Sequence, residues 1–280
     1  MATLFLVGTP IGNLEDITLR AQRVLSEVAV IAAEDTRVTR HLLDRYGIGT
    51  SMVTFTDAYD SRKQSRLARV IEVLDRGEDV ALVSDAGMPG ISDPGYQLVA
   101  GVLKKGHDVQ VVPGPSAITS ALVISGLPAD RFLFVGFLPR RAAARRALFA
   151  QVADEPGTVV AFESPHRLVA ALEDLLAVLG NRSVAVGREL TKRFEEMWRG
   201  QAADAAVYFT EHPPRGEITL LLGGTGQVRD QEVWNSAQVR SAVEMLTSEG
   251  LAPSAVARIV ARLSGWKRND VYEFRRGFGG

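Results

Sequence analysis

Short runs of apolar residues alternate with amphipathic stretches along most of this chain of 280 residues. The apolar runs are rich in β-branched side chains, which is typical of buried strands, and the amphipathic stretches have helical spacing. This alternation, with short connections, predicts an α/β fold with mostly parallel sheets. The predicted strands are 4–8, 29–33, 79–85, 109–114, 132–137, 158–162, 183–190 and 216–224, and the predicted helices are 18–28, 36–46, 65–77, 94–105, 116–126 and 168–180.

The pattern divides the chain into three parts. The alternation restarts near residue 115, so we expect one α/β domain over 1–115 and a second over 116–226. A glycine-rich stretch follows, and the last part has helical spacing with no strand pattern. We therefore expect a small helical appendage over 231–280, with short helices at 237–246, 253–263 and 269–275.

Composition excludes several kinds of chemistry. The chain has no cysteine, which rules out thiolate nucleophiles, disulfides and cysteine-ligated metal centres. Its four histidines are scattered without metal-ligand spacing, so we expect no metal site. No apolar segment approaches the roughly 20 residues of a membrane span, and the N-terminus does not resemble a secretory signal. These observations predict a soluble cytoplasmic protein without membrane contact.

The charge is close to balanced overall but uneven along the chain. Lysine and arginine number 32 against 33 acidic residues, a net charge of −1, which argues against a general polycation. The segment 131–146 nevertheless holds five arginines and no acid, and 235–280 holds seven basic and four acidic residues among several aromatics. Phosphate backbones attract such clusters. For the second segment, the pattern slightly favours the alternative of a solvated helix face with its aromatics packed inward.

Glycine- and proline-rich loops follow three predicted strands, at the sheet edge where ligands bind in α/β folds. They are Gly8–Gly12, Ser84–Gly95 and Pro113–Ala117. Asp85 is placed to accept hydrogen bonds from ribose hydroxyls or an amine, whereas Asp93 and Ser116 are expected to cap the helices that follow. Neither a dinucleotide fingerprint nor a Walker phosphate loop is present.

Two later strand ends carry dense polar runs, Phe162–Arg167 and Gly187–Glu196. Each run is compatible with a helix start and a solvated face. Four functional side chains within five positions after one strand favour a site instead.

At these loops the sequence resembles a known family. The segments LFLVGTPIGNLEDIT, AEDTR, VSDAGMPGISDPG, VPGPSA, GFLPR, FESPHR, RELTK and GEITLLL, in this order over about residues 3–224, resemble the ribosomal RNA small subunit methyltransferase I family. That family belongs to the tetrapyrrole-methylase-like class of S-adenosylmethionine enzymes. The resemblance implies two α/β domains of the tetrapyrrole methylase type with the cofactor cleft between them, plus a small C-terminal helical module. Met88 departs mildly from it, because a small residue such as threonine is expected there.

The resemblance also implies a reaction. A methyl group would pass from S-adenosylmethionine to the ribose 2′-hydroxyl of a cytidine in the decoding region of 16S ribosomal RNA, in the small ribosomal subunit, and the enzyme would be a homodimer. The residues implied as cofactor contacts are Gly8, Pro10, Ile11, Asp85, Met88, Ser116, Ala117 and Phe162.

A ribose hydroxyl is a poor nucleophile, so a base or a favourable electrostatic setting should assist the transfer. The candidates, which the sequence does not rank, are Glu163, Glu189, Lys192 and Asp35. The side chains expected to hold RNA are Arg37, Arg140, Arg141, Arg145, Arg146, His166, Arg167, Lys267 and Arg268.

Two alternatives remain beside this hypothesis. The same fold could methylate a tetrapyrrole or another small molecule, or the protein could be a non-enzymatic RNA-binding module. The arginine-rich segment favours RNA over a small molecule. The number of polar loops at strand ends favours an enzyme over a binding module.

Overall fold

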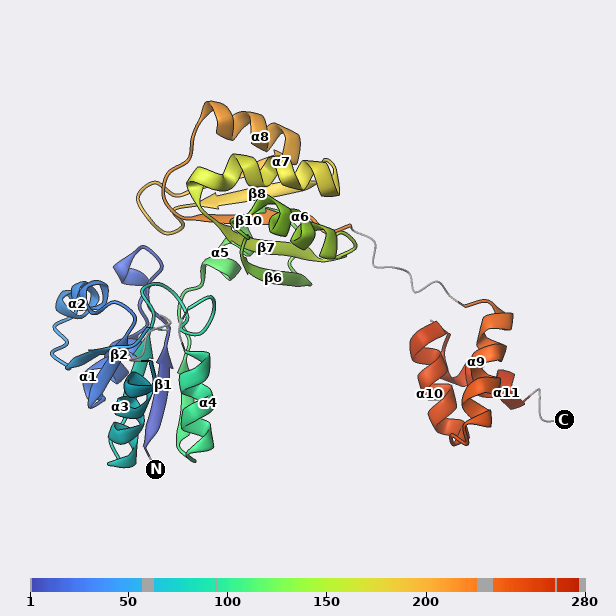
Figure 1. Ribbon diagram of the computed structural model, residues 1–280, viewed down its shortest axis with the longest axis horizontal. Helices are drawn as coiled ribbons and strands as arrows, with labels where there is room; N and C mark the ends of the chain where they lie inside the picture. The colour runs from blue at the N-terminus through green and yellow to red at the C-terminus, as the bar shows by residue number, and fades with distance from the viewer. Residues whose placement is uncertain (1, 57–62, 94, 226–233, 265, 277–280) are drawn as a thin grey trace. The chain divides into compact units, whose positions relative to one another are not determined.

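The structure, a computed structural model, describes residues 2–56, 63–93, 95–225, 234–264 and 266–276 (Figure 1). Its contacts group the chain into two compact units. The first comprises Met1–Ala153 with Thr158–Gly223, and the second comprises Asp154–Gly157 with Gly224–Gly280. The first unit contains two sheets, which we call the N-lobe and the C-lobe.

The N-lobe is a five-stranded sheet with the order β3-β2-β4-β1-β5, in which all neighbouring strands are parallel. Every residue of its central strands β2 and β4 is buried, as expected for a parallel sheet covered on both faces. The strands are β1 (Thr3–Val7), β2 (Val30–Ala33), β3 (Met52–Thr54), β4 (Val80–Val83) and β5 (Asp108–Val112).

Helices cover both faces of this sheet (Figure 1). One buried cluster joins α1 and α2 to the strands, and another joins α3 and α4 to the opposite face. The lobe is therefore a three-layer α/β structure with its loops gathered at the carboxyl ends of parallel strands. The helical segments are η1 (Leu14–Asp16), α1 (Leu19–Glu27), α2 (Thr36–Arg45), α3 (Lys63–Asp75) and α4 (Tyr96–Lys104).

The C-lobe is also a five-stranded sheet, with the order β6-β7-β10-β8-β9. Strand β10 lies antiparallel between β7 and β8, and β9 is antiparallel to β8. The expectation of a mostly parallel sheet is therefore wrong for this lobe, which is mixed. The strands are β6 (Phe132–Phe137), β7 (Thr158–Glu163), β8 (Ser183–Arg188), β9 (Glu196–Gln201) and β10 (Ile218–Leu222).

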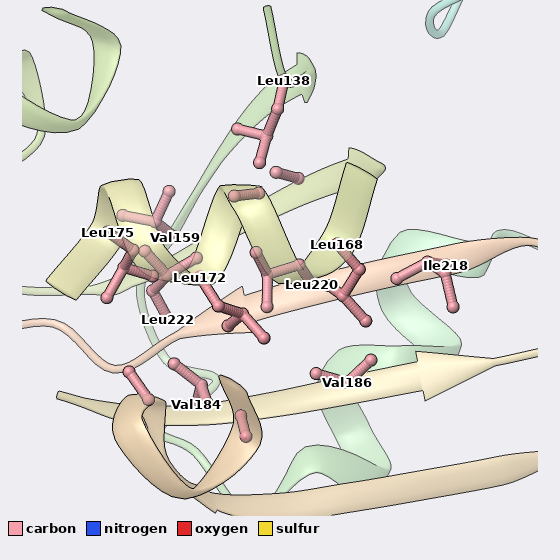
Figure 2. Close-up of a cluster of buried hydrophobic side chains, with 14 of the residues drawn as sticks. Leu138, Val159, Leu168, Leu172, Leu175, Val184, Val186, Ile218, Leu220 and Leu222 are labelled. Atoms are coloured by element: carbon pink, nitrogen blue, oxygen red, sulfur yellow. The ribbon is translucent and has the colours of Figure 1, made fainter. Parts of the chain in front are cut away.

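Helix α5 covers one face of the C-lobe sheet, and α6, α7 and α8 cover the other. Figure 2 shows the larger cluster, in which Leu168, Leu172 and Leu175 of α7 meet Val186 and Leu220 of the strands. Burial of such side chains stabilises each lobe by about 25 cal/mol per Å² of apolar surface. The helical segments are α5 (Ala117–Ser125), α6 (Ala142–Gln151), η2 (Pro165–Arg167), α7 (Leu168–Leu179) and α8 (Ala202–Glu211).

The second unit is helical and has its own core. It contains α9 (Ser236–Ser248), α10 (Pro253–Ser264) and α11 (Arg268–Arg276), and Asn235 with Gln238 forms a capping box at the start of α9. Trp266 and Phe274 pack against this core with ring centroids 5.2 Å apart. These two aromatics are thus turned inward, as the alternative interpretation of the tail expected, and Phe278 lies outside the described residues.

These layers confirm the predicted fold class of two α/β lobes and a helical module. The predicted elements did not include β3, α6, β9 or α8. Strand β3 has three residues, and β9 is an edge strand of mixed charged and aromatic residues, so neither has a buried-strand pattern. None of the described helices is long and apolar enough to cross a membrane.

Candidate functional site

A cavity of about 270 Å³ is lined by residues of both lobes of the first unit. Its N-lobe lining comes from the loops that follow β1, β2, β4 and β5. Its C-lobe lining comes from the ends of β6 and β7 and the start of β10. Concave sites with an apolar lining and a few convergent polar groups are typical of small-molecule sites.

The N-lobe loops around this cavity are tied to one another. The backbone N–H of Thr9 donates to the carbonyl of Gly87 at 2.9 Å, and the N–H of Gly87 donates back to Thr9 at 3.1 Å. Gly8 packs directly on Gly114, where a Cβ on Gly8 would lie 2.7 Å from the Gly114 backbone. Glycine is therefore required at Gly8 because two loops approach there without room for a side chain.

Most of the predicted cofactor contacts meet in the cavity. Gly8 and Pro10 do not line it, because Gly8 holds two loops together and Pro10 is buried beneath the surface. The predicted residues that do line it are Ile11, Asp85, Met88, Ser116, Ala117 and Phe162.

Aromatic side chains form part of the C-lobe lining. Phe137 and Phe162 both line the cavity, with ring centroids 5.3 Å apart, and Phe134 supports Phe162 from behind at 5.0 Å. Phe137 is 61% exposed. An exposed aromatic face on a rigid strand provides a flat apolar surface for a planar group.

The N-lobe wall carries carboxylates held by backbone donors. Asp85 Oδ1 accepts a hydrogen bond from the N–H of Asp35 at 3.0 Å, and the N–H of Asp85 donates to Glu34 Oε2 at 3.3 Å. Partial loss of hydration in the cavity raises the pKa of Asp85. Glu34 and Asp85 thus link the ends of β2 and β4 at the cavity.

Asp93 lies on the same wall and has a different role from the one its sequence context predicts. Helix α4 begins at Tyr96 with Gly95 at the N-cap position, so Asp93 does not cap it. Its side chain lines the cavity, and the nearby Ser84 hydroxyl donates to the Gly87 carbonyl at 3.4 Å. Burial, reinforced by the carboxylates of Glu34 and Asp85, raises the pKa of Asp93 to about 6.

The C-lobe wall contains a fully buried carboxylate. The Glu163 side chain is 0% exposed, and its Oε1 pairs with Arg167 Nη2 at 2.5 Å and accepts from the N–H of Ser164 at 2.6 Å. Its Oε2 has no partner among the described residues, and neither do Nε and Nη1 of Arg167. Unsatisfied buried polar atoms are rare in folded proteins, so this group is a candidate functional group of the C-lobe wall.

A second ion cluster borders this wall. Lys192 Nζ lies 2.9 Å from Glu189 Oε1 and 3.1 Å from Glu217 Oε2, and Glu217 lines the cavity. Burial favours a higher pKa for Glu189, but hydrogen bonds from the Glu217 N–H and Lys192 outweigh it, so the pKa of Glu189 is lowered. The pKa of Lys192 is raised, because its bonds to the two glutamates outweigh its burial.

Backbone strain concentrates around the cavity. Three described residues other than glycine have a positive φ: Ser92 at 62°, Glu189 at 50° and Thr191 at 64°. Ser92 lines the cavity, and the other two flank the turn that positions Lys192. Strain of this kind costs of order 1–3 kcal/mol per residue and clusters at functional sites.

The structure ranks the four candidate bases. Asp35 caps α2 and pairs with Arg37 at 2.6 Å, and hydrogen bonds from Arg37 lower the pKa of Asp35 to about 2. A carboxylate with such a pKa is a poor proton acceptor. Glu189 and Lys192 neutralise each other outside the cavity, which leaves Glu163 as the candidate that lines it.

The predicted RNA-binding side chains fall into different settings. Arg145 is 4% exposed, and its guanidinium bonds Asp174 beneath α6 and α7, so it cannot face a nucleic acid and its prediction is wrong. Arg167 is engaged with Glu163. The side chain of Arg268 lies outside the described residues. The predicted residues that are exposed, or half-exposed for Arg146, are Arg37, Arg140, Arg141, Arg146, His166 and Lys267.

Three acidic residues of the lining were not among the predicted contacts: Glu34, Asp93 and Glu217. Glu34 is part of the AEDTR segment and Asp93 of the loop after β4, so both signals were present in the sequence. Glu217 precedes a strand, and nothing in its local sequence indicates a site. Among the described residues, no group of three or more histidine, aspartate or glutamate side chains has the arrangement of a metal site.

Comparison with known proteins identifies relatives of this chain. The model of the tetrapyrrole (corrin/porphyrin) methylases matches residues 3–206. A ribosomal RNA small subunit methyltransferase I from Halalkalibacterium halodurans is 43% identical over 272 residues, 96% of this chain and 93% of the relative. The protein of the same name from Thermotoga maritima is 48% identical over 224 residues, 80% of this chain and 99% of the relative.

Solved structures share the fold. Uroporphyrin-III-C-methyltransferase from Thermus thermophilus superimposes with a TM-score of 0.55, covering 81% of this chain and 96% of that one. The two sequences are 22% identical, so this likeness shows the fold alone.

Proposed function

Because the chain belongs to the ribosomal RNA small subunit methyltransferase I family, within the tetrapyrrole methylases, we propose that it transfers a methyl group from S-adenosylmethionine to 16S ribosomal RNA. The acceptor we propose is the ribose 2′-hydroxyl of a cytidine in the decoding region. We propose that the protein acts in the cytoplasm. The observation that carries the proposal is the cavity, whose charged lining residues are all carboxylates.

The residues of the cavity fit the cofactor. Its apolar and aromatic side chains, among them Ile11, Met88 and Phe162, suit a purine ring, and Asp85 suits hydroxyl or amine donors. The unpartnered Oε2 of Glu163 supports a bound group with a donor or a positive charge. When bound, S-adenosylmethionine supplies a methyl group on a positively charged sulfur that leaves as a neutral thioether.

We propose that the protein promotes the transfer by positioning the reactants and by providing a charged group. The tied loops at Thr9 and Gly87 hold the N-lobe wall in place before a ligand arrives, which reduces the entropy lost on reaching a reactive geometry. We propose Glu163 as the group that accepts the proton of the ribose hydroxyl as the oxygen–carbon bond forms. Arg167 holds the Glu163 carboxylate in a fixed orientation for that role.

Exposed arginines around α6 support an RNA surface on the first unit. Arg140 and Arg141 are exposed, Arg146 is half-exposed, and no acidic residue occurs between 131 and 146. The Thermotoga maritima relative matches this chain over 224 residues, which make up 99% of its own length. That length suffices for the first unit alone, and this also favours an RNA surface there. Lys267 of the second unit is exposed as well, and we propose it as a separate RNA contact.

Replacing Arg140, Arg141 and Arg146 by alanine should lower RNA affinity and reduce the slope of log affinity against log salt by about 2 to 3. Filter binding of a decoding-region RNA at several salt concentrations measures both quantities. Arg145→Ala is not a matched control because it disrupts a buried ion pair, so Arg20→Ala, at an exposed position on α1, serves instead. An unchanged salt slope would place the RNA elsewhere.

Exposed apolar side chains on β5, α5 and β6 support a homodimer. Strands β5 and β6 are edge strands of their sheets, and apolar patches on such a surface commonly mark an interface. A molar mass of twice 30.3 kDa in light scattering would agree with the proposal, and a monomer at micromolar concentration would contradict it. The apolar side chains exposed there are Val111, Val123, Ile124, Phe132 and Leu133.

One assay tests the function. Purified protein and methyl-labelled S-adenosylmethionine are incubated with small ribosomal subunits, with naked 16S RNA, or with a porphyrinoid. We expect label on RNA, and mass spectrometry of nucleosides should find it on the ribose of a cytidine. Label on the porphyrinoid alone, or RNA binding without transfer, would contradict the proposal.

A further inference from the structure

The charges that line the cavity all have the same sign. Five carboxylates line it, and no lysine, arginine or histidine is among its described lining residues. The cavity therefore favours a positively charged ligand over a neutral one of the same shape. The carboxylates are Glu34, Asp85, Asp93, Glu163 and Glu217.

The carboxylates differ in how their charge is offset. On the C-lobe wall, Glu163 pairs with Arg167, and Glu217 pairs with Lys192. On the N-lobe wall, neither Asp85 nor Asp93 forms an ion pair with a described residue. Asp85 accepts a backbone N–H, and both carboxylates line the cavity, so the negative charge of each faces it.

We propose that Asp93 is the specificity-determining residue by which this site distinguishes S-adenosylmethionine from its demethylated product. The inference rests on the proposed function. Methyl transfer breaks the bond from carbon to sulfur and leaves the electron pair on sulfur, which loses its positive charge. A carboxylate that attracts the charged sulfur therefore loses that attraction when the reaction is complete, and the product is released more readily.

Asp93 is better suited to this role than the other carboxylates. It is half-buried, where Coulomb interactions are screened less than at the surface, and its side chain lines the cavity. One oxygen of Asp85 accepts the Asp35 N–H, and the charges of the C-lobe glutamates are offset by Arg167 and Lys192. Asp93 directly follows Ser92, which lines the same cavity with a positive φ of 62°.

The charge of Asp93 changes within an accessible pH range. Its pKa is raised to about 6 by burial and by the carboxylates of Glu34 and Asp85, with Glu163 and Glu217 across the same cavity. Above that pH the carboxylate is charged and attracts a cation. As the pH falls through about 6 it becomes neutral and the attraction is lost. A bound cation favours the ionised form, so binding near pH 6 should release a proton.

The experiment is calorimetric titration of the full chain with S-adenosylmethionine and, separately, with S-adenosylhomocysteine. At pH 7.5, about tenfold lower affinity for S-adenosylmethionine is expected in Asp93→Asn, with less than about threefold change for S-adenosylhomocysteine. In the wild-type protein the ratio of the two affinities should fall between pH 7.5 and pH 5, and in Asp93→Asn it should fall less. Asp44→Asn, an exposed carboxylate on α2, is the matched control and should change neither affinity.

The outcomes separate this inference from the proposed function. Retained affinity for the product shows that the variant site is folded, so a selective loss supports the inference. An equal loss for both ligands, or no loss for either, overturns it. Wild-type protein that binds neither ligand would overturn the proposed cofactor site itself. No RNA is present, so an error in the RNA substrate does not affect the result.

Discussion

The two walls of the cavity carry the same kind of charge in different settings. On the C-lobe wall Glu163 is 0% exposed and has a guanidinium at 2.5 Å. On the N-lobe wall Asp85 and Asp93 lie at more hydrated positions, where Asp85 accepts a backbone N–H and neither forms an ion pair with a described residue. The buried carboxylate of the C-lobe wall has a cation as its partner, and the more exposed carboxylates of the N-lobe wall do not.

This difference teaches how one site can combine stability with attraction for a cation. Burying a carboxylate costs several kcal/mol of lost hydration, so it stays charged only beside a cation. A carboxylate at a loop that remains partly hydrated needs only hydrogen bonds. The C-lobe wall is therefore close to neutral, and the N-lobe wall keeps the charge that a cationic ligand would meet.

Removing the cation from the C-lobe wall breaks this comparison and should have the largest effect. Arg167→Met keeps the apolar stem but leaves the buried Glu163 carboxylate without its partner. We expect the free energy of unfolding to fall by about 3 kcal/mol. Urea denaturation followed by circular dichroism measures this change.

The matched control for that variant is Arg146→Met, whose guanidinium is half-exposed at 3.3 Å from Asp174. It should change the free energy of unfolding by less than about 1 kcal/mol. The double variant Glu163→Gln/Arg167→Met should recover part of the loss, because it removes the unpaired charge. A loss in Arg167→Met no greater than in the control would show that Glu163 does not depend on its cation.

Removing a carboxylate from the N-lobe wall should act on binding rather than on folding. Asp85→Ala deletes a negative charge at the cavity and the acceptor of the Asp35 N–H. We expect affinity for S-adenosylmethionine to fall more than about tenfold in calorimetric titration, while the free energy of unfolding changes by less than about 1 kcal/mol.

Asp85→Asn separates the two contributions of this residue, because the amide oxygen can still accept the Asp35 N–H. An intermediate loss of affinity is expected if charge and geometry both contribute. Unchanged affinity in Asp85→Ala would remove Asp85 from the cofactor site.

The N-lobe wall was largely predictable from the sequence. Its loops directly follow strands that are apolar throughout, and parallel strands bring their carboxyl ends to one edge. Asp85, Met88 and Ser116 could therefore be placed together before any coordinates. Asp93 was assigned to a helix cap because an aspartate before a helix usually caps it, but α4 begins later than that pattern suggests.

The C-lobe wall was predictable only in part. Glu163 follows a strongly apolar strand and could be singled out, but Glu217 lies beside it only because β10 enters the sheet antiparallel next to β7. Residue Ile218 is paired with Glu163 in that register, and no local pattern encodes such a pairing. The burial of Arg145 was missed for a similar reason, since its partner Asp174 is on another helix.

Removing the second cation of the C-lobe wall should have the smallest effect and sharpens the comparison. Lys192→Met keeps the stem that packs on Gly12 but removes the charge that offsets Glu217. The Glu217 side chain is 71% exposed, so water screens most of its charge. We therefore expect affinity for S-adenosylmethionine to rise about twofold, with no change for S-adenosylhomocysteine. Raising the salt concentration from 0.02 to about 0.5 M should abolish the rise, because exposed charges are screened at that ionic strength. A fall in affinity would instead show that Lys192 itself contacts the cofactor, and the two walls would then differ in more than the burial of their carboxylates.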